Sequence, residues 1–395
     1  IIDLRNLNRV KVEKNIIHAE AGTPKGHLDK LLKEKNLFLG PNPSVGAYCK
    51  IGGMVATNAS GSRTLKYGSM IDNLIEVEFV DGHGNIVTLP NDSEISQKIL
   101  QISQNTNKEG FPKVTKNSCG YRLDTINSIN DAHKILAASE GTLGIILSVK
   151  LRVHSQPHAR KLLIYEYDSV FNAMNDCKII IKAKPSALEF VDESTLKNID
   201  YSFSKKTKCL LFIELDENLG NDKKLQKFLK GRLVKTITND KEIQRWWRYR
   251  DSSLSYSLKN ILKSEKAPHI VEDATVPIHN LNKLVSLVDK IKKEFHCRAI
   301  LYGHAGNGNI HVRLVTKKKS KDMIKKIARM YFSRVIQLGG SITGEHGDGL
   351  ARTEFIKEQY NSEIYHNFKQ LKRVLDPHNI FNPDKIISDK SQVVE

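Results

Sequence analysis

The spacing of apolar residues over the first 157 positions alternates between the period of a strand and the period of a helix. Residues 143–153 alternate apolar and polar side chains, as a strand with one buried face does. Leu28 and Leu32 lie on one helical face, and Thr23-Pro24 before them is typical of a helix start, with Thr as N-cap. Residues 81–84 (Asp-Gly-His-Gly) separate two strand-like runs, which predicts a hairpin. This region therefore predicts short strands and helices joined by glycine turns.

The pattern changes near Pro157, where we place a domain boundary. Apolar runs at 162–167 and 210–215 indicate strands, and Leu281, Leu284 and Val288 share one helical face. A further helix is expected over 322–338, closed by Gly339. Alternation of strands and helices favours an α+β domain whose antiparallel sheet is covered by helices. We expect a first domain over 1–157 and a second over 158–370.

Composition narrows the function classes. The 395 residues carry a formal net charge of +18, which would suit nucleic acid. The lysine runs at 205–206 and 317–319 lack interleaved aromatic residues, so a solvated surface, or transient contact with an anionic membrane or acidic partner, is favoured over nucleic acid.

Cysteine usage and hydropathy bear on location. Five scattered cysteines without a CxxC pair indicate a reducing compartment and argue against an iron–sulfur cluster within the chain. No apolar stretch approaches the roughly 18 residues of a membrane span. We expect a cytoplasmic protein that could lie at the inner face of the membrane.

Residues 41–68 are rich in glycine and other small residues, including Ile51-Gly52-Gly53 and Asn58-Ala59-Ser60-Gly61. Small residues let backbone amides approach a flat or phosphorylated ligand closely. The segment is neither a Walker loop nor a GxGxxG helix start. From these residues alone, a tight turn between strands explains the pattern equally well.

Two later segments carry histidine and glutamate within glycine-rich turns. His304 and His311 flank one glycine loop, and Glu345 and His346 lie in the second segment. Two imidazoles and a carboxylate with open positions suit Zn²⁺, Mn²⁺ or Fe²⁺. A single histidine is usually structural, but four such groups in two glycine-rich turns favour a functional site.

In this order, the segments resemble the FAD-linked oxidases of the vanillyl-alcohol oxidase (PCMH) type, in their D-lactate dehydrogenase/glycolate oxidase branch. The motifs that carry the likeness are Ile-Gly-Gly at 51–53, Lys-Asn-Ser-Cys-Gly-Tyr at 116–121, Glu-Gly-Thr-Leu-Gly at 140–144, Gly-His-x-Gly-Asn-Gly-Asn-x-His at 303–311, Gly-Glu-His-Gly-Asp-Gly at 344–349 and the ending at 376–385. The likeness covers about residues 1–388. It implies a partial PCMH-type FAD-binding domain, then a ferredoxin-like α+β substrate (cap) domain, with residues 371–395 returning to the flavin domain. Relatives begin with a further pyrophosphate-binding subdomain, so we expect the chain to be a fragment or truncated product.

The resemblance implies non-covalently bound FAD. The residues expected to line it are Pro43, Ser44, Gly52, Gly53, Asn58, Gly61, Glu140, Gly141, Gly144, Ile145 and Asn382. Lys50 departs from the family, whose members usually carry Thr, Ser or His there.

The resemblance also assigns the substrate side. His304, His311 and Glu345 would bind the metal, and His346 would remove the hydroxyl proton. Arg250 would hold the substrate carboxylate, although from the residues alone a surface or structural ion pair is favoured for it. Arg313 lies two positions after His311, on the same side of a strand, and is expected to be a second carboxylate contact or a selector for a longer diacid. Asn309 is also expected to contact the substrate. Relatives acting on dicarboxylates carry a lysine where this chain has Val271, which argues against the same dicarboxylate specificity in this chain.

The expected activity is oxidation of a small (R)-2-hydroxy acid to the 2-oxo acid by hydride transfer to flavin N5. D-lactate is the first candidate, followed by glycolate and 2-hydroxyglutarate. A cytochrome, quinone, electron-transfer flavoprotein or iron–sulfur module would accept the electrons. The alternatives are a catalytically incompetent fragment or subunit of a flavin/iron–sulfur dehydrogenase and, from charge alone, a nucleic-acid binder. The sequence does not determine the oligomeric state.

Overall fold

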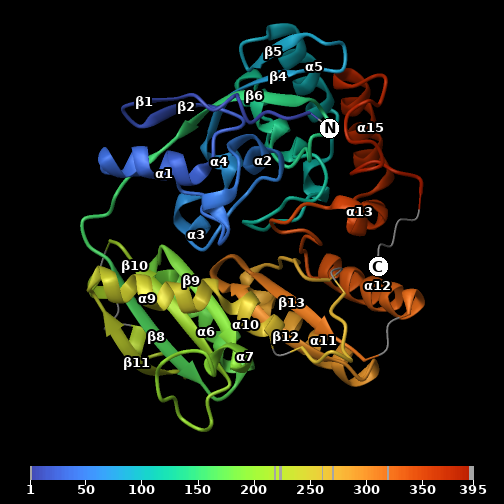
Figure 1. Cartoon of the computed structure of the whole chain (residues 1–395). Helices are drawn as coiled ribbons and strands as arrows, with labels where there is room; N and C mark the ends of the chain where they lie inside the picture. The colour runs from blue at the N-terminus through green and yellow to red at the C-terminus, as the bar shows by residue number, and fades with distance from the viewer. Residues whose placement is uncertain are drawn as a thin grey trace.

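The computed structural model describes residues 2–217, 219–221, 225–259, 261–268, 271–317 and 320–390. Lys318 and Lys319 of the predicted lysine run lie outside these residues. The described chain forms two large antiparallel sheets, each with its own helices, and Figure 1 shows them one above the other.

The first sheet has five strands in the order β1-β2-β6-β4-β5. Their bounds are Val10–Glu13 (β1), Ile16–Glu20 (β2), Leu74–Val80 (β4), Ile86–Leu89 (β5) and Ile145–Arg152 (β6). β6 matches the predicted alternating strand, and β4 pairs with β5 as the predicted hairpin. The short strands β3 (Leu37–Phe38) and β7 (His154–Ser155) pair separately.

Five helices within residues 25–104 pack beside this sheet. Their bounds are Lys25–Glu34 (α1), Ile51–Ala56 (α2), Thr64–Tyr67 (α3), Met70–Asn73 (α4) and Ser93–Gln104 (α5). The predicted start of α1 was wrong by one residue, because Pro24 itself occupies the N-cap and Thr23 makes no cap bond. Asp92 caps α5 by accepting the backbone N–H of Ile95.

The second sheet has six antiparallel strands in the order β11-β8-β10-β9-β12-β13. Their bounds are Lys161–Tyr167 (β8), Ala187–Asp192 (β9), Cys209–Leu215 (β10), Arg232–Ile237 (β11), Arg298–His304 (β12) and Asn309–Val315 (β13). The helices of this part are Val170–Ile180 (α6), Glu193–Leu196 (α7), Asp240–Asp251 (α9), Ser253–Lys259 (α10), Leu281–Glu294 (α11) and Lys321–Gln337 (α12).

Helices cover both faces of this sheet, which explains the uninterrupted apolar runs in β8 and β10. Leu163 and Tyr165 share a hydrophobic cluster with α6 and α11, whereas Leu162 and Ile164 share another with Trp246 of α9. A strand with helices on both sides loses the apolar–polar alternation. The predicted α+β arrangement is confirmed, and Gly339 follows α12 with a φ of +75°, as expected of a C-terminal cap.

The chain then returns to the first domain through α13 (Gly349–Arg352), α14 (Ile356–Gln359) and α15 (Ser362–Leu375). Figure 1 shows α15 beside the first sheet, next to α5. Phe368 packs its ring 5.5 Å from that of Tyr121, and Leu375 O accepts the N–H of Gly82 at 2.7 Å. The helix α15, which begins at Ser362, therefore packs on the first domain.

Candidate active site

Two adjoining cavities form the candidate site, and the larger lies between the domains. The larger, of about 590 Å³, is lined by Pro43, Ser44 and Gly61 from the first domain and by the histidine segments from the second. The smaller, of about 400 Å³, is lined by first-domain residues. Lys50 and Gly53 line both cavities, so the two cavities adjoin at these residues.

The glycine loop between β12 and β13 brings the two histidines to the larger cavity. The strands pair so that His304 lies opposite Asn309 and Tyr302 opposite His311. Gly308 turns the chain with a φ of +73°, and a Cβ there would lie 1.8 Å from Val276 O. Only glycine fits this turn, and the turn sets where His304 and His311 lie relative to each other.

The three predicted metal ligands come together. Glu345 Oε1 lies 3.0 Å from His304 Nε2 and 3.1 Å from His311 Nε2. On their far sides, His304 Nδ1 lies 2.8 Å from Glu189 and His311 Nδ1 lies 3.2 Å from Glu272 O. These outer contacts orient each ring with Nε2 facing Glu345, as in many metal sites. Their role as ligands stays a prediction.

The first domain holds the other oxygen of Glu345. Lys116 Nζ donates to Glu345 Oε2 at 2.7 Å, and Ser60 Oγ contacts the same atom. Burial alone would raise the pKa of Glu345, but His304 and Lys116 outweigh it and hold that pKa well below its usual range. The Glu345 carboxylate is therefore ionised and is contacted by side chains of both domains.

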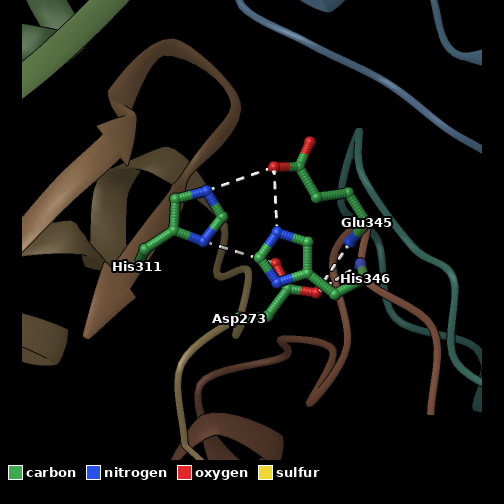
Figure 2. Close-up of side chains that lie close together, drawn as sticks. All are labelled: Asp273, His311, Glu345 and His346. Carbon is green, nitrogen blue, oxygen red and sulfur yellow. Dashed lines mark hydrogen bonds and ion pairs between the residues drawn. The ribbon is translucent and has the colours of Figure 1, made fainter. Parts of the chain in front are cut away.

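His346, the predicted base, lies beside the cluster formed by His304, His311 and Glu345. Figure 2 shows His346 with Asp273, His311 and Glu345, whose potential ligand atoms all lie within 4.8 Å of one another. Its ring stacks on His311 at 4.9 Å, and its Nδ1 lies 3.5 Å from Glu272 Oε1. Its side chain is 41% exposed. Burial lowers its pKa, but Asp273 and Glu272 outweigh that effect and raise the pKa of His346 to about 9.

Buried groups of both charges surround Glu345. The four carboxylates of the cluster and its surroundings are those of Glu189, Glu272, Asp273 and Glu345. The buried permanent cations that act on them are those of Lys116, Arg250, Arg313 and Arg352. A metal ion bound here would add positive charge, which favours the neutral form of His346.

Arg250 and Arg313, the predicted substrate arginines, both line the larger cavity. Arg250, in α9, donates from Nε to Glu189 at 2.7 Å, and Arg313, in β13, lies 2.9 Å from Glu272. A guanidinium has five N–H donors, so each arginine can bind a ligand as well as its carboxylate.

Two predicted ligand-binding asparagines have protein partners instead of a place on either cavity wall. The Asn309 amide donates to Asp273 Oδ1 at 3.2 Å and to Ala274 O at 3.1 Å. The Asn58 carbonyl accepts the N–H of Ile71 at 2.9 Å. Both side chains are buried, and they position backbone around the site.

Glu140 and Asn382 also make protein contacts. The Glu140 carboxylate accepts the N–H of Asp348, and that of Gly349 at 2.9 Å, while Asn382 donates to Glu140 O at 2.7 Å. Of the other predicted FAD residues, the smaller cavity is lined by Gly52, Gly53, Gly141, Gly144 and Ile145.

Sequence reasoning missed several residues of the site. Lys116, Glu189, Glu272 and Asp273 all contact the cluster, and Tyr302 lines the cavity. Lys116 stands in a motif that was recognised, but nothing local indicated that it reaches Glu345, 229 positions away. Asp273 stands in the Asp-x-x-x-Pro stretch from which position 271 was compared with relatives, but nothing local indicated that Glu272 or Asp273 reaches the cluster.

Family models match both parts of the chain. The C-terminal domain of FAD linked oxidases matches residues 156–386, and an FAD binding domain matches residues 1–90. No described helix is long and apolar enough to cross a membrane.

Characterised proteins of this family align with nearly all of the chain. Glycolate oxidase subunit GlcD of Bacillus subtilis is 30% identical over 91% of this chain and 72% of that subunit. D-lactate dehydrogenase of Archaeoglobus fulgidus is 26% identical over 96% of this chain and 78% of its own length. D-2-hydroxyglutarate dehydrogenase of Pseudomonas putida is 27% identical over 97% of this chain, which spans only 42% of that enzyme.

A solved structure shares the fold. One of alkyldihydroxyacetonephosphate synthase superposes with a TM-score of 0.64 at 19% identity, covering 97% of this chain and 68% of that one. Together with the family matches, this confirms the resemblance inferred from the motifs. The chain belongs to the FAD-linked oxidase family and groups with its glycolate oxidase, D-lactate dehydrogenase and D-2-hydroxyglutarate dehydrogenase members.

Proposed function

We propose that the chain is the flavin- and substrate-binding part of a dehydrogenase that oxidises a small (R)-2-hydroxy acid to the 2-oxo acid. One observation carries this proposal: a single cavity has glycine-rich backbone on one wall and arginines with a histidine–glutamate cluster on the other. The relatives' names point the same way, since they include glycolate oxidase and D-lactate dehydrogenase. D-lactate is our first candidate substrate, followed by glycolate and 2-hydroxyglutarate.

The cavity walls fit FAD. A Cβ added to Gly53 would meet no atom within 4 Å, and the same holds for Gly141, whose φ is +66°. Both glycines line the smaller cavity, so bare backbone faces open space where a flat cofactor can lie. We propose that FAD extends through both cavities past Lys50 and Gly53. FAD supplies the hydride acceptor when bound.

The donor set fits a divalent metal. His304, His311 and Glu345 would hold it, because their three facing atoms already converge. A metal there supplies positive charge that favours ionisation of the substrate hydroxyl. Among Zn²⁺, Mn²⁺ and Fe²⁺ the donor set does not discriminate.

The protein's own groups divide the remaining work. Arg250 and Arg313 would bind the substrate carboxylate, for which the planar guanidinium is suited. With a metal ion adding positive charge to the cluster, His346 would be neutral and would accept the hydroxyl proton at Nε2, while Glu272 beside Nδ1 keeps the ring oriented. The hydroxyl carbon then gives up its hydride, and the product keeps its carboxylate on the arginines. We propose a protein or quinone as electron acceptor; some relatives are named for cytochrome.

Replacing His346 by Ala tests the proposal. The purified protein, loaded with FAD, should lose its yellow absorbance when D-lactate is added without oxygen. The His346→Ala variant should react about 10²- to 10⁴-fold more slowly, the usual contribution of a general base, with flavin content unchanged.

A matched control is His366→Ala. His366 lies on the exposed side of α15, where it contacts Gln370, and its replacement should leave the reaction rate unchanged. Full-rate bleaching by His346→Ala would reject the role of that residue. A wild-type protein that cannot be loaded with FAD, or that none of the three acids reduces, would instead support the incompetent-fragment alternative.

A further inference from the structure

Residues 272–276 form a strap between the two histidine motifs. Thr275 and Ser341 exchange two backbone hydrogen bonds of 2.9 and 2.8 Å. On the other side, Val312 N donates to Glu272 O at 3.2 Å. The strap is thereby bonded both to β13, which carries His311, and to the segment that leads into Glu345.

Asp273 lies at the centre of this strap. Its Oδ2 accepts three consecutive backbone N–H groups, from Gly344 at 3.0 Å, Glu345 at 2.9 Å and His346 at 2.8 Å. A run of N–H groups around one anion fixes the backbone dihedral angles of the turn that supplies them. The turn that presents Glu345 and His346 is therefore shaped by a carboxylate about 70 positions earlier (Figure 2).

The second oxygen of Asp273 contacts the other motif. Oδ1 accepts from the Asn309 amide at 3.2 Å and lies 3.6 Å from His311 Nδ1. Asp273 is 0% exposed and does not line the cavity, and its oxygens face protein donors. These contacts favour a role in positioning the cluster over one as a direct metal ligand, although its carboxylate lies close to the other three groups.

We propose that Asp273 is the positioning residue that couples the two motifs, holding the turn at 344–346 so that Glu345 faces both imidazoles. This inference rests on the proposed function, since it supposes that the cluster holds a metal. The proposal also accounts for the contacts of Asn309, whose amide donates to the Asp273 carboxylate and would orient it instead of contacting substrate.

The test is Asp273→Asn, which keeps the size of the side chain but removes its charge and turns one acceptor into a donor. Manganese(II) binding to the full chain is titrated from the electron paramagnetic resonance signal of the free ion. We expect affinity to fall about 10- to 100-fold, the usual effect of losing an outer-shell partner, with FAD content unchanged. Hydrogen exchange of the peptide containing Gly344–His346 should accelerate in the same variant.

Asp176→Asn is the matched control. Asp176 is also buried and also accepts three hydrogen bonds, from Tyr167 Oη, Lys230 N and Gly231 N, but it lies in α6 and does not line the cavity. It should lower thermal stability without changing manganese affinity or exchange at 344–346. If Asp273→Asn does not fold, Asn309→Ala, which removes only one donor to Asp273, should shift both readouts in the same direction.

The outcomes separate the inference from the proposed function. Manganese affinity within threefold of wild type together with unchanged exchange would overturn the role of Asp273. A wild-type protein that binds neither manganese nor zinc would remove the metal from the proposed function. In that case the exchange rates at Gly344–His346 decide the role of Asp273 without it.

Discussion

Gly53→Ala should affect the fold and the cofactor in opposite directions. Gly53 is an exposed residue of α2 that lines both cavities, and a Cβ built on it meets nothing within 4 Å. Within a helix, alanine is more favourable than glycine by about 0.5–1 kcal/mol, because glycine loses more backbone entropy on folding. Since the added methyl enters open space, the apoprotein should gain up to that amount of stability.

FAD should bind the same variant more weakly. If the cofactor packs against the bare backbone of Gly53, the methyl occupies volume that the cofactor needs. Forcing one extra carbon into a close-packed contact costs about 1–3 kcal/mol. At about 1.4 kcal/mol for each factor of ten, the Kd for FAD should rise roughly 5- to 150-fold. Quenching of free FAD fluorescence on titration with apoprotein measures this Kd, and thermal unfolding of the apoprotein measures the stability.

The neighbouring glycine provides the control. A Cβ on Gly52 would lie 2.7 Å from Ala21 Cβ, closer than real contacts allow, so Gly52→Ala should destabilise the apoprotein. The two substitutions add the same methyl at adjacent positions and should change stability with opposite signs. Unchanged FAD affinity in Gly53→Ala would refute the placement of the cofactor, and equal stability losses in both variants would refute the reasoning from open space.

Two further predictions concern charge. Lys50→Thr removes a cation that lines both cavities, so FAD, with its anionic pyrophosphate, should bind severalfold more weakly and with less dependence on salt; titrations at two ionic strengths measure this. Burial, and then the charge of Asp348, raise the pKa of Glu140 to about 7, so the native state binds a proton more tightly than the unfolded chain. The stability from this proton is complete below the ordinary pKa of 4.5 and is lost as pH rises through 7. Glu140→Gln should therefore lose less stability than wild type between pH 5 and pH 8 in urea unfolding, and an unchanged slope with pH would contradict the assignment.

Local patterns predicted the elements because their causes are local. The alternation at 143–153 gave β6, the turn at 81–84 gave the β4–β5 hairpin, and Gly339 ended α12. Residues 362–375 form an amphipathic helix, α15, but the pattern does not say which surface its apolar face covers. That choice depends on the complementary face of the first domain, around Tyr121, which lies more than 200 positions earlier in the sequence.

The candidate site, like the fold, was predicted only in part from the sequence. The recognised motifs identified His304, His311 and Glu345, and the structure places these side chains together. The groups that orient them come from elsewhere in the chain: Glu189 from β9 and Asp273 from the strap. A single sequence carries no information on which buried carboxylate faces which imidazole, because that pairing follows from strand order and not from spacing along the chain.

Glu345 shows why the flavin wall and the metal cluster are best regarded as one unit. Its Oε1 faces two imidazoles of the second domain, while its Oε2 contacts Ser60 and Lys116 of the first. Ser60 itself lines the larger cavity. A shift of the first domain therefore displaces a proposed metal ligand directly, without any intervening side chain. Removing the Lys116 ammonium would leave the Glu345 carboxylate buried without its first-domain cation, at a cost of about 3–5 kcal/mol, so the cluster depends on a group of the first domain.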